Sequence, residues 1–138
     1  MFQVIRRTDY SLRALIFLAQ QGDRIIAREE IVEALGVPSE SFALALKNLA
    51  RHRLLRSFRG TGGGFQLGRP ASEITLRHIV EAVEGQIVLN HCLIDAASCD
   101  RQPLCNVHGV WRDVQSKLNG ILDSYTVEQL ANETSDEG

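Results

Sequence analysis

The spacing of apolar residues along the chain predicts a mainly α-helical protein with one small β-hairpin. Apolar side chains recur every three or four residues over 8–20, where Thr8 is the candidate N-cap. The same period returns over 28–35 and again over 39–52, where Phe42, Leu46 and Leu49 form the stripe expected to be buried. Gly36 stands between these two segments and predicts that the first one ends in a tight turn.

Two helices joined by a short turn that contains glycine form a helix-turn-helix unit. In such units the second helix lies in the major groove of DNA, with its N-terminal residues at the base edges. Ser39 is the candidate cap of that helix. The candidate base-contacting residues are Ser39, Glu40, Ser41 and Ala43. Lys47 and Arg51 lie further along the helix and suit phosphates.

A β-hairpin is predicted directly after this unit. Residues 54–58 and 65–67 have strand character, and the glycine-rich run 59–64 joins them. A basic hairpin that follows a helix-turn-helix is a wing, whose tip can reach the minor groove or the phosphates. Arg59 and Thr61 are the candidate contacts at the tip.

The C-terminal half predicts three more helices. Thr75 caps the first, which ends at Gly85, and a capping box over 126–129 opens the last. Between them, a long helix from about residue 106 carries one apolar stripe, which consists of Val107, Val110, Trp111, Val114, Leu118, Ile121, Leu122 and Tyr125. We expect this stripe to pack against the same helix of a second subunit, and packing within its own chain is the alternative.

The charges are distributed unevenly along the 138 residues. Residues 1–77 carry 12 Lys and Arg against 7 Asp and Glu, whereas residues 78–138 carry 3 against 10. Residues 41–72 contain no acid and six cations, which is the pattern of a polyanion site or of a solvated basic face. No apolar run is long enough to span a membrane, and no signal peptide precedes the chain, so we expect a cytoplasmic protein.

The three cysteines and one histidine fall close together in a polar, turn-rich segment. Cys92, Cys99 and Cys105 are followed by His108, and thiolate with imidazole is a ligand set for iron–sulfur clusters or zinc. Zinc sites usually contain a closely spaced Cys-x-x-Cys pair, which is missing here, so the spacing favours a cluster over zinc. A structural zinc site and a metal-free thiol switch remain the alternatives.

No catalytic constellation is evident, so we do not expect an enzyme. The other histidines, His52, His78 and His91, stand singly in the sequence without a nucleophile beside them.

The whole chain resembles the winged helix-turn-helix iron–sulfur regulators of bacteria, which include the iron–sulfur cluster assembly regulator and the nitric-oxide-sensitive repressor. The resemblance rests on TDYSLRALIFLA, SFRGTGGGFQLGRP, ITLRHIVEAVEG and the three cysteines with CNVHGVW. It implies a homodimer that binds palindromic double-stranded DNA, with Cys92, Cys99 and Cys105 as cluster ligands. Six residues separate the first two cysteines, where family members commonly have five or fewer.

The resemblance leaves two candidates for the fourth ligand. One branch of the family uses a histidine three residues after the last cysteine, which is His108 here, and the other uses an aspartate near the start of the first helix, which is Asp9. Imidazole is the better donor to a cluster iron on ligand softness, which favours His108 over Asp9. A [2Fe–2S] cluster, which we favour, would go with His108, and [4Fe–4S] would go with Asp9. We expect a winged domain at 1–85, a cluster loop and dimerisation helix at 86–131, and a disordered acidic tail at 132–138.

Overall fold

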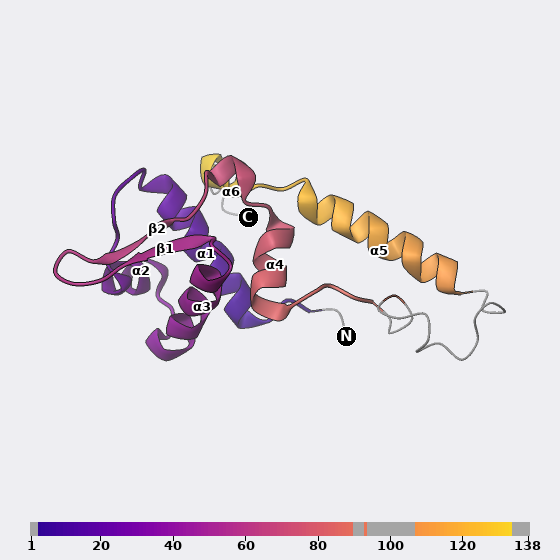
Figure 1. The fold of residues 1–138 in the computed structure, drawn as a ribbon, viewed down its shortest axis with the longest axis horizontal. Helices are drawn as coiled ribbons and strands as arrows, with labels where there is room; N and C mark the ends of the chain where they lie inside the picture. Colours follow the sequence, from indigo (N-terminus) through magenta and orange to yellow (C-terminus); the bar gives the residue numbers. More distant parts are fainter. Residues whose placement is uncertain (1–2, 90–92, 94–106, 134–138) are drawn as a thin grey trace.

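The computed structural model describes residues 3–89, 93 and 107–133 of the chain. It is mainly helical with one two-stranded sheet, as the sequence predicts (Figure 1). In chain order the elements are α1 Arg6–Gln20, α2 Arg28–Leu35, α3 Ser39–Arg51, β1 Leu55–Phe58, β2 Gly64–Leu67, the 3-10 turn η1 Ala71–Glu73, α4 Leu76–Glu84, α5 His108–Asp123 and α6 Val127–Asn132. No helix within these described ranges is long and apolar enough to cross a membrane.

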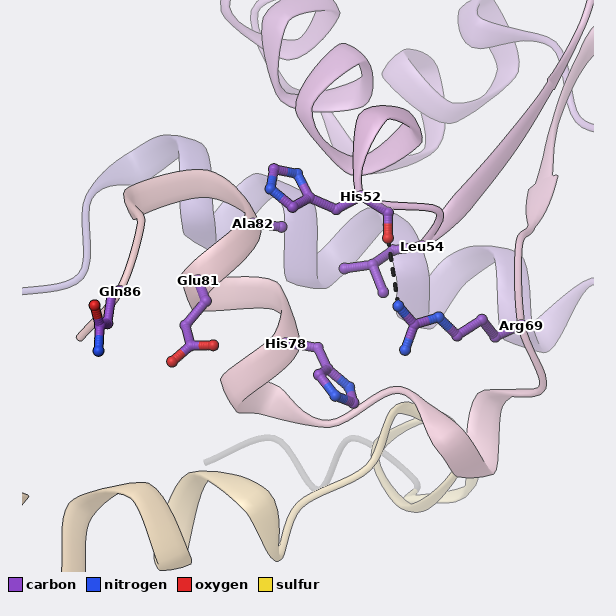
Figure 2. Close-up of a pocket in the computed structure, with 7 residues that line it drawn as sticks. All are labelled: His52, Leu54, Arg69, His78, Glu81, Ala82 and Gln86. Carbon is purple, nitrogen blue, oxygen red and sulfur yellow. Dashed lines mark hydrogen bonds between the residues drawn. The ribbon is translucent and has the colours of Figure 1, made fainter. Parts of the chain in front are cut away.

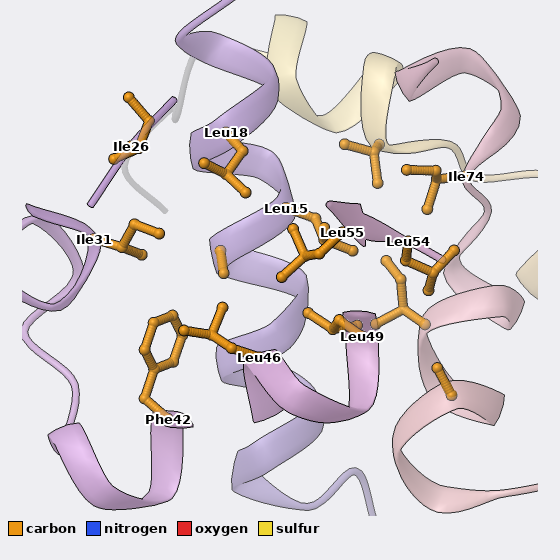
Figure 3. Close-up of a cluster of buried hydrophobic side chains, with 14 of the residues drawn as sticks. Leu15, Leu18, Ile26, Ile31, Phe42, Leu46, Leu49, Leu54, Leu55 and Ile74 are labelled. Carbon is orange, nitrogen blue, oxygen red and sulfur yellow. The ribbon is translucent and has the colours of Figure 1, made fainter. Parts of the chain in front are cut away.

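One apolar core of the described residues joins helices α1 to α4 with the hairpin, and these elements together are called the winged body below. Figure 3 shows the centre of this core between α1 and α3. The predicted inward stripe of α3 is confirmed, because Phe42, Leu46 and Leu49 are fully buried. Segments far apart in sequence share this core, since Ile26 before α2 and Ile74 before α4 are also buried. The orientation of α3 on the body is therefore fixed by apolar packing on its inner side, which leaves the outer side free.

The wing is an antiparallel hairpin in which Leu55 pairs with Leu67 and Phe58 pairs with Gly64. The segment before α2 extends this sheet, because Ile26 and Phe65 exchange both of their backbone hydrogen bonds, at 2.9 and 2.8 Å. Gly64 lies against the backbone of Ile26 so closely that a β-carbon there would collide with the Ile26 carbonyl oxygen. Glycine is therefore needed at position 64 for close backbone packing, and not only for the turn at the tip of the hairpin.

The C-terminal helix α6 packs against α1 and η1, so the end of the described chain returns to the winged body. Val127 is 1% exposed and belongs to the core. The backbone ties this return in place, since Leu76 donates to Tyr125 and Val127 donates to Ile74, both at 2.9 Å. The predicted N-cap at Thr75 and the predicted capping box at Thr126 are both confirmed, and His78 completes a box at Thr75 as well.

Helix α5 leaves the winged body as an arm, and its N-terminal end is the end farthest from that body (Figure 1). The predicted apolar stripe of α5 has one half-buried side and one exposed side. Trp111, Leu118 and Leu122 are half-buried. The exposed part consists of Val107, Val110, Val114, Ile121 and Tyr125.

Two predicted caps are wrong. Helix α1 begins at Arg6 with Ile5 as its N-cap, and Thr8 is buried inside the helix, where its hydroxyl hydrogen-bonds the carboxylate of Glu84 at the end of α4. Helix α3 begins at Ser39 with Pro38 as its N-cap, and no side chain caps it. In both cases the helix starts earlier than its hydroxyl residue suggests.

Candidate DNA interface and metal-binding segment

The outer face of α3 is the candidate recognition surface. Ser39, Glu40 and Ser41 are exposed in its first turn, and Lys47 and Arg51 are exposed further along. Because the opposite side of α3 is buried in the core, all five predicted contacts are available to a partner of the winged body. Ala43 is half-buried at the edge of this face.

The ion pairs of the described residues all lie outside the basic stretch 41–72. Their cations are Arg13, Arg24, Arg77 and Lys117. None of the six cations in residues 41–72 has a carboxylate partner among the described residues. Cations that no carboxylate neutralises leave a positive field, which favours a polyanion.

The wing adds exposed positive charge beside α3. Arg59 and Thr61 are exposed in the turn between the two strands. On β1, the guanidinium of Arg56 lies over the ring of Phe58, 5.1 Å from its centroid. The wing therefore presents cations both on its strand and in its turn.

The three predicted cysteine ligands, Cys92, Cys99 and Cys105, lie outside the described residues. No group of three or more metal-ligating side chains occurs in the part of the chain that the structure describes. The predicted fourth ligand His108 is the first residue of α5. Its Nε2 accepts a hydrogen bond of 2.9 Å from Arg112, while its Nδ1 is buried and has no hydrogen-bond partner among the described residues.

The alternative fourth ligand Asp9 lies in the first turns of α1. Its carboxylate accepts a hydrogen bond of 2.8 Å from Arg13, four residues later, and both side chains are exposed. Within a single chain, Asp9 thus forms an exposed ion pair with a residue one turn along its own helix.

Two of the isolated histidines line one cavity of about 300 Å³, together with Arg69 and Glu81 (Figure 2). Their rings point in different directions, and each has a structural role. His52 Nδ1 bonds the Asn48 carbonyl oxygen at 2.9 Å, and His78 Nδ1 accepts from the Thr75 backbone at 3.1 Å. The cavity therefore brings the imidazoles near one another without forming a catalytic or metal-binding arrangement.

Two exposed side chains at the candidate interface were missed by the sequence reasoning. Leu44 is 44% exposed on the outer face of α3, one helical turn from both Glu40 and Lys47. Leu44 does not belong to the buried stripe of Phe42, Leu46 and Leu49, so helical spacing alone could have predicted that it is exposed. Arg28 begins α2 near Lys47, but it precedes the acid-free stretch, so charge alone did not mark it.

An interhelical ion-pair network joins α4 to α5. Arg77 Nη1 lies 3.1 Å from Asp123 Oδ2, and Arg77 Nε lies 3.1 Å from Glu81 Oε1. These hydrogen bonds, to Asp123 first and then to Glu81, raise the pKa of Arg77 above its ordinary value. The C-terminal end of α5 is thus held to the winged body by charge as well as by the chain.

Comparisons with known proteins agree with this architecture. The Rrf2 family, described as iron-dependent transcriptional regulators, matches residues 4–133. The transcriptional regulator NsrR of Oceanobacillus iheyensis is 31% identical over 125 residues, which are 89% of this chain and 85% of that protein. The regulator IscR of Photorhabdus laumondii is 30% identical over 126 residues, 89% of this chain and 75% of that protein.

Among solved structures, CymR, described as the global cysteine regulator of B. subtilis, superposes with a TM-score of 0.76. It is 26% identical and covers 97% of this chain and 99% of its own. The family and these relatives are regulators and not enzymes, as the sequence predicted. The chain belongs to the Rrf2 family of winged helix-turn-helix transcriptional regulators.

Proposed function

We propose that this chain is a homodimeric cytoplasmic transcription regulator whose affinity for a palindromic operator is set by an iron–sulfur cluster. Cys92, Cys99 and Cys105 would hold the cluster as thiolates, and His108 would supply the fourth ligand. The proposal draws on the basic surface without carboxylate partners and on similarity to regulators named IscR and NsrR.

The observation that carries the cluster proposal is the buried, unpartnered Nδ1 of His108. A guanidinium only donates hydrogen bonds, so Nε2 of His108 is the acceptor and a neutral ring carries its proton on Nδ1. Burying such a donor without a partner costs about 1–3 kcal/mol. His108 follows Cys105 by three residues, and imidazole is a good donor to iron, so the residue fits a cluster.

Ligation by His108 excludes its contact with Arg112. An iron bound at Nε2 would take the position of the guanidinium. An iron bound at Nδ1 would leave the ring proton on Nε2, which then has no lone pair for Arg112. Arg112 therefore competes with the cluster for His108, and we expect Arg112→Ala to slow cluster loss.

Dimerisation is proposed from the exposed half of the α5 stripe. Three of its exposed residues, Val110, Val114 and Ile121, lie on α5, with Val107 directly before the helix and Tyr125 two residues after its end, and nothing in the described chain covers them. A second copy of the same helix would bury them, and a twofold dimer reads two half-sites of inverted sequence.

A bound iron–sulfur cluster supplies a redox-active group whose loss or oxidation can report redox state, nitric oxide or iron supply. The chain's own part is to hold the cluster next to the N-terminal end of α5. We favour [2Fe–2S], because a histidine ligand goes with that type in the resembling branch.

A metal-free thiol regulator is the second candidate. It is favoured by the similarity to CymR, a regulator described by its role in cysteine control, at 26% identity. In that case the cysteines would respond to oxidation by forming a disulfide, and no iron would be required.

The test is anaerobic purification, followed by a visible spectrum and by iron and sulfide analysis. We expect a brown protein that contains both elements, and a Cys99→Ala variant that is colourless but folded. Operator affinity should differ between the cluster-loaded and cluster-free protein at one salt concentration. A colourless protein whose operator affinity changes only on thiol oxidation would favour the second candidate, and stoichiometric zinc would indicate a structural metal.

A further inference from the structure

A cavity of about 250 Å³ opens between α3 and the hairpin. Its apolar part is formed by Ala43, Leu46 and Ala50 of α3 and by Phe65 of β2. Its polar part is formed by Lys47 of α3, Ser57 of β1 and Arg28 of α2. The helices α2 and α3 and the hairpin, three units that are separate in sequence, therefore surround one depression on the candidate DNA surface.

The position of this cavity is set by the winged architecture. A recognition helix occupies the major groove and a wing reaches the adjacent minor groove. One sugar–phosphate strand separates those two grooves, so it must pass between the helix and the wing. The cavity lies in that gap, because α3 lines one side of it and β1 with β2 lines the other.

We propose that this cavity is the seat of one deoxyribose-phosphate unit of the DNA strand that runs between α3 and the wing. The inference rests on the proposed DNA-binding function and adds a site, with Arg28 as its previously unassigned cation. The apolar floor suits the C–H face of the sugar, and the polar rim suits the phosphate oxygens.

The charges at the rim fit a phosphate. Arg28 and Lys47 are exposed, and neither forms an ion pair within the described residues. Arg28 is also the first residue of α2, where the helix dipole adds positive potential. Of the two acids that follow it, Glu30 is engaged by Arg24 at 3.2 Å, and Glu29 is exposed.

The hydroxyl of Ser57 supplies a donor of a different kind. Ser57 pairs with Phe65 across the hairpin and is exposed on β1. A hydroxyl can donate to a phosphate oxygen without adding charge. Such a seat contacts no base, so it should strengthen binding to a duplex of any sequence. It should also fix the position of the DNA strand relative to α3 and the wing.

The test is fluorescence anisotropy with a short random-sequence duplex at several sodium chloride concentrations. Arg28→Ala should weaken binding about tenfold and flatten the salt slope by about one, as expected for one lost phosphate contact. Arg28→Lys should restore the slope, because the charge returns. Ala50→Leu should also weaken binding while it keeps every cation, because the added side chain fills the floor.

Lys117→Ala is the control, since Lys117 is an exposed cation on α5 that is paired with Asp113 and does not line the cavity. Its affinity should stay within twofold of the wild type. If the wild type binds duplex with a normal salt slope, either an unchanged slope in Arg28→Ala or an equal loss in Lys117→Ala would overturn the seat alone. A wild type that binds no duplex at low salt would overturn the proposed DNA-binding function itself.

Discussion

The exposed stripe of α5 gives a quantitative expectation for dimer stability. Replacing Ile121 by alanine removes three carbon atoms, and burying each is worth about 0.8 kcal/mol. Ile121 is 58% exposed in one chain. A partner can therefore remove only that share from water, which leaves about 1.4 kcal/mol per subunit. A twofold interface contains the substitution twice, so the dissociation constant should rise about a hundredfold.

Sedimentation equilibrium of the wild type and of Ile121→Ala measures this constant directly. The matched control is Ile25→Ala, which makes the same change at an isoleucine that is 41% exposed between α1 and α2, away from α5. We expect the control to dimerise like the wild type. If Ile121→Ala and Ile25→Ala dimerise equally well, α5 is not the interface, and a monomeric wild type that binds its operator tightly would refute the dimer.

Three further expectations concern the wing, the hairpin turn and the fourth ligand. Arg59→Ala should weaken operator binding by about 1–3 kcal/mol if Arg59 contacts a base, and gel-shift titration measures this loss. Gly64→Ala should lower the melting temperature clearly more than Gly62→Ala, since only the β-carbon at Gly64 would meet backbone atoms. His108→Ala should shift the visible spectrum or destabilise the cluster while Asp9→Ala is mild, and the reverse result would make Asp9 the ligand.

Periodicity was sufficient to predict the winged body wherever a helix buries one side. The α3 stripe is an example, because Phe42, Leu46 and Leu49 repeat at helical spacing and all three are in the core. Local chemistry was also sufficient at Thr75, whose hydroxyl accepts from His78 three residues later, as a cap requires. These features depend on neighbours within one or two turns, which the sequence displays directly.

Contacts between distant residues could not be predicted in the same way. Thr8 resembles a cap, but its hydroxyl bonds Glu84, 76 residues away. Val127 lies in an ordinary capping-box helix, and nothing local shows that this helix packs on α1. The cavity beside Arg28 arises from α2, α3 and the hairpin at once, so neither a motif nor a charge run could reveal it.

The candidate site was predicted unevenly for a related reason. Composition identified the basic stretch, and its cations are indeed without carboxylate partners in the described chain. The ligand residues follow from thiolate and imidazole chemistry, but the choice between His108 and Asp9 depends on how two subunits meet, which one chain does not contain. The contact between His108 and Arg112 shows only which ring nitrogen of His108 is without a partner among the described residues.

Arg77 provides the last expectation, which concerns communication between α5 and the DNA-reading elements. Helix α4 packs against α1, α3 and α5, so it is in contact with both halves of the molecule. Arg77 bonds Glu81 and Asp123 at 3.1 Å each, and these hydrogen bonds raise the pKa of Arg77 above its ordinary value.

Removing Arg77 should loosen α5 against α4 without disturbing the core, because Arg77 is not part of the apolar core cluster. We therefore expect Arg77→Ala to bring the ratio of operator affinities, cluster-loaded to cluster-free, closer to one. Lys117→Ala, which breaks the exposed pair with Asp113 within α5, is the control and should leave that ratio unchanged. An unchanged ratio in Arg77→Ala would mean that the ion pair holds α5 in place but transmits nothing to the DNA surface.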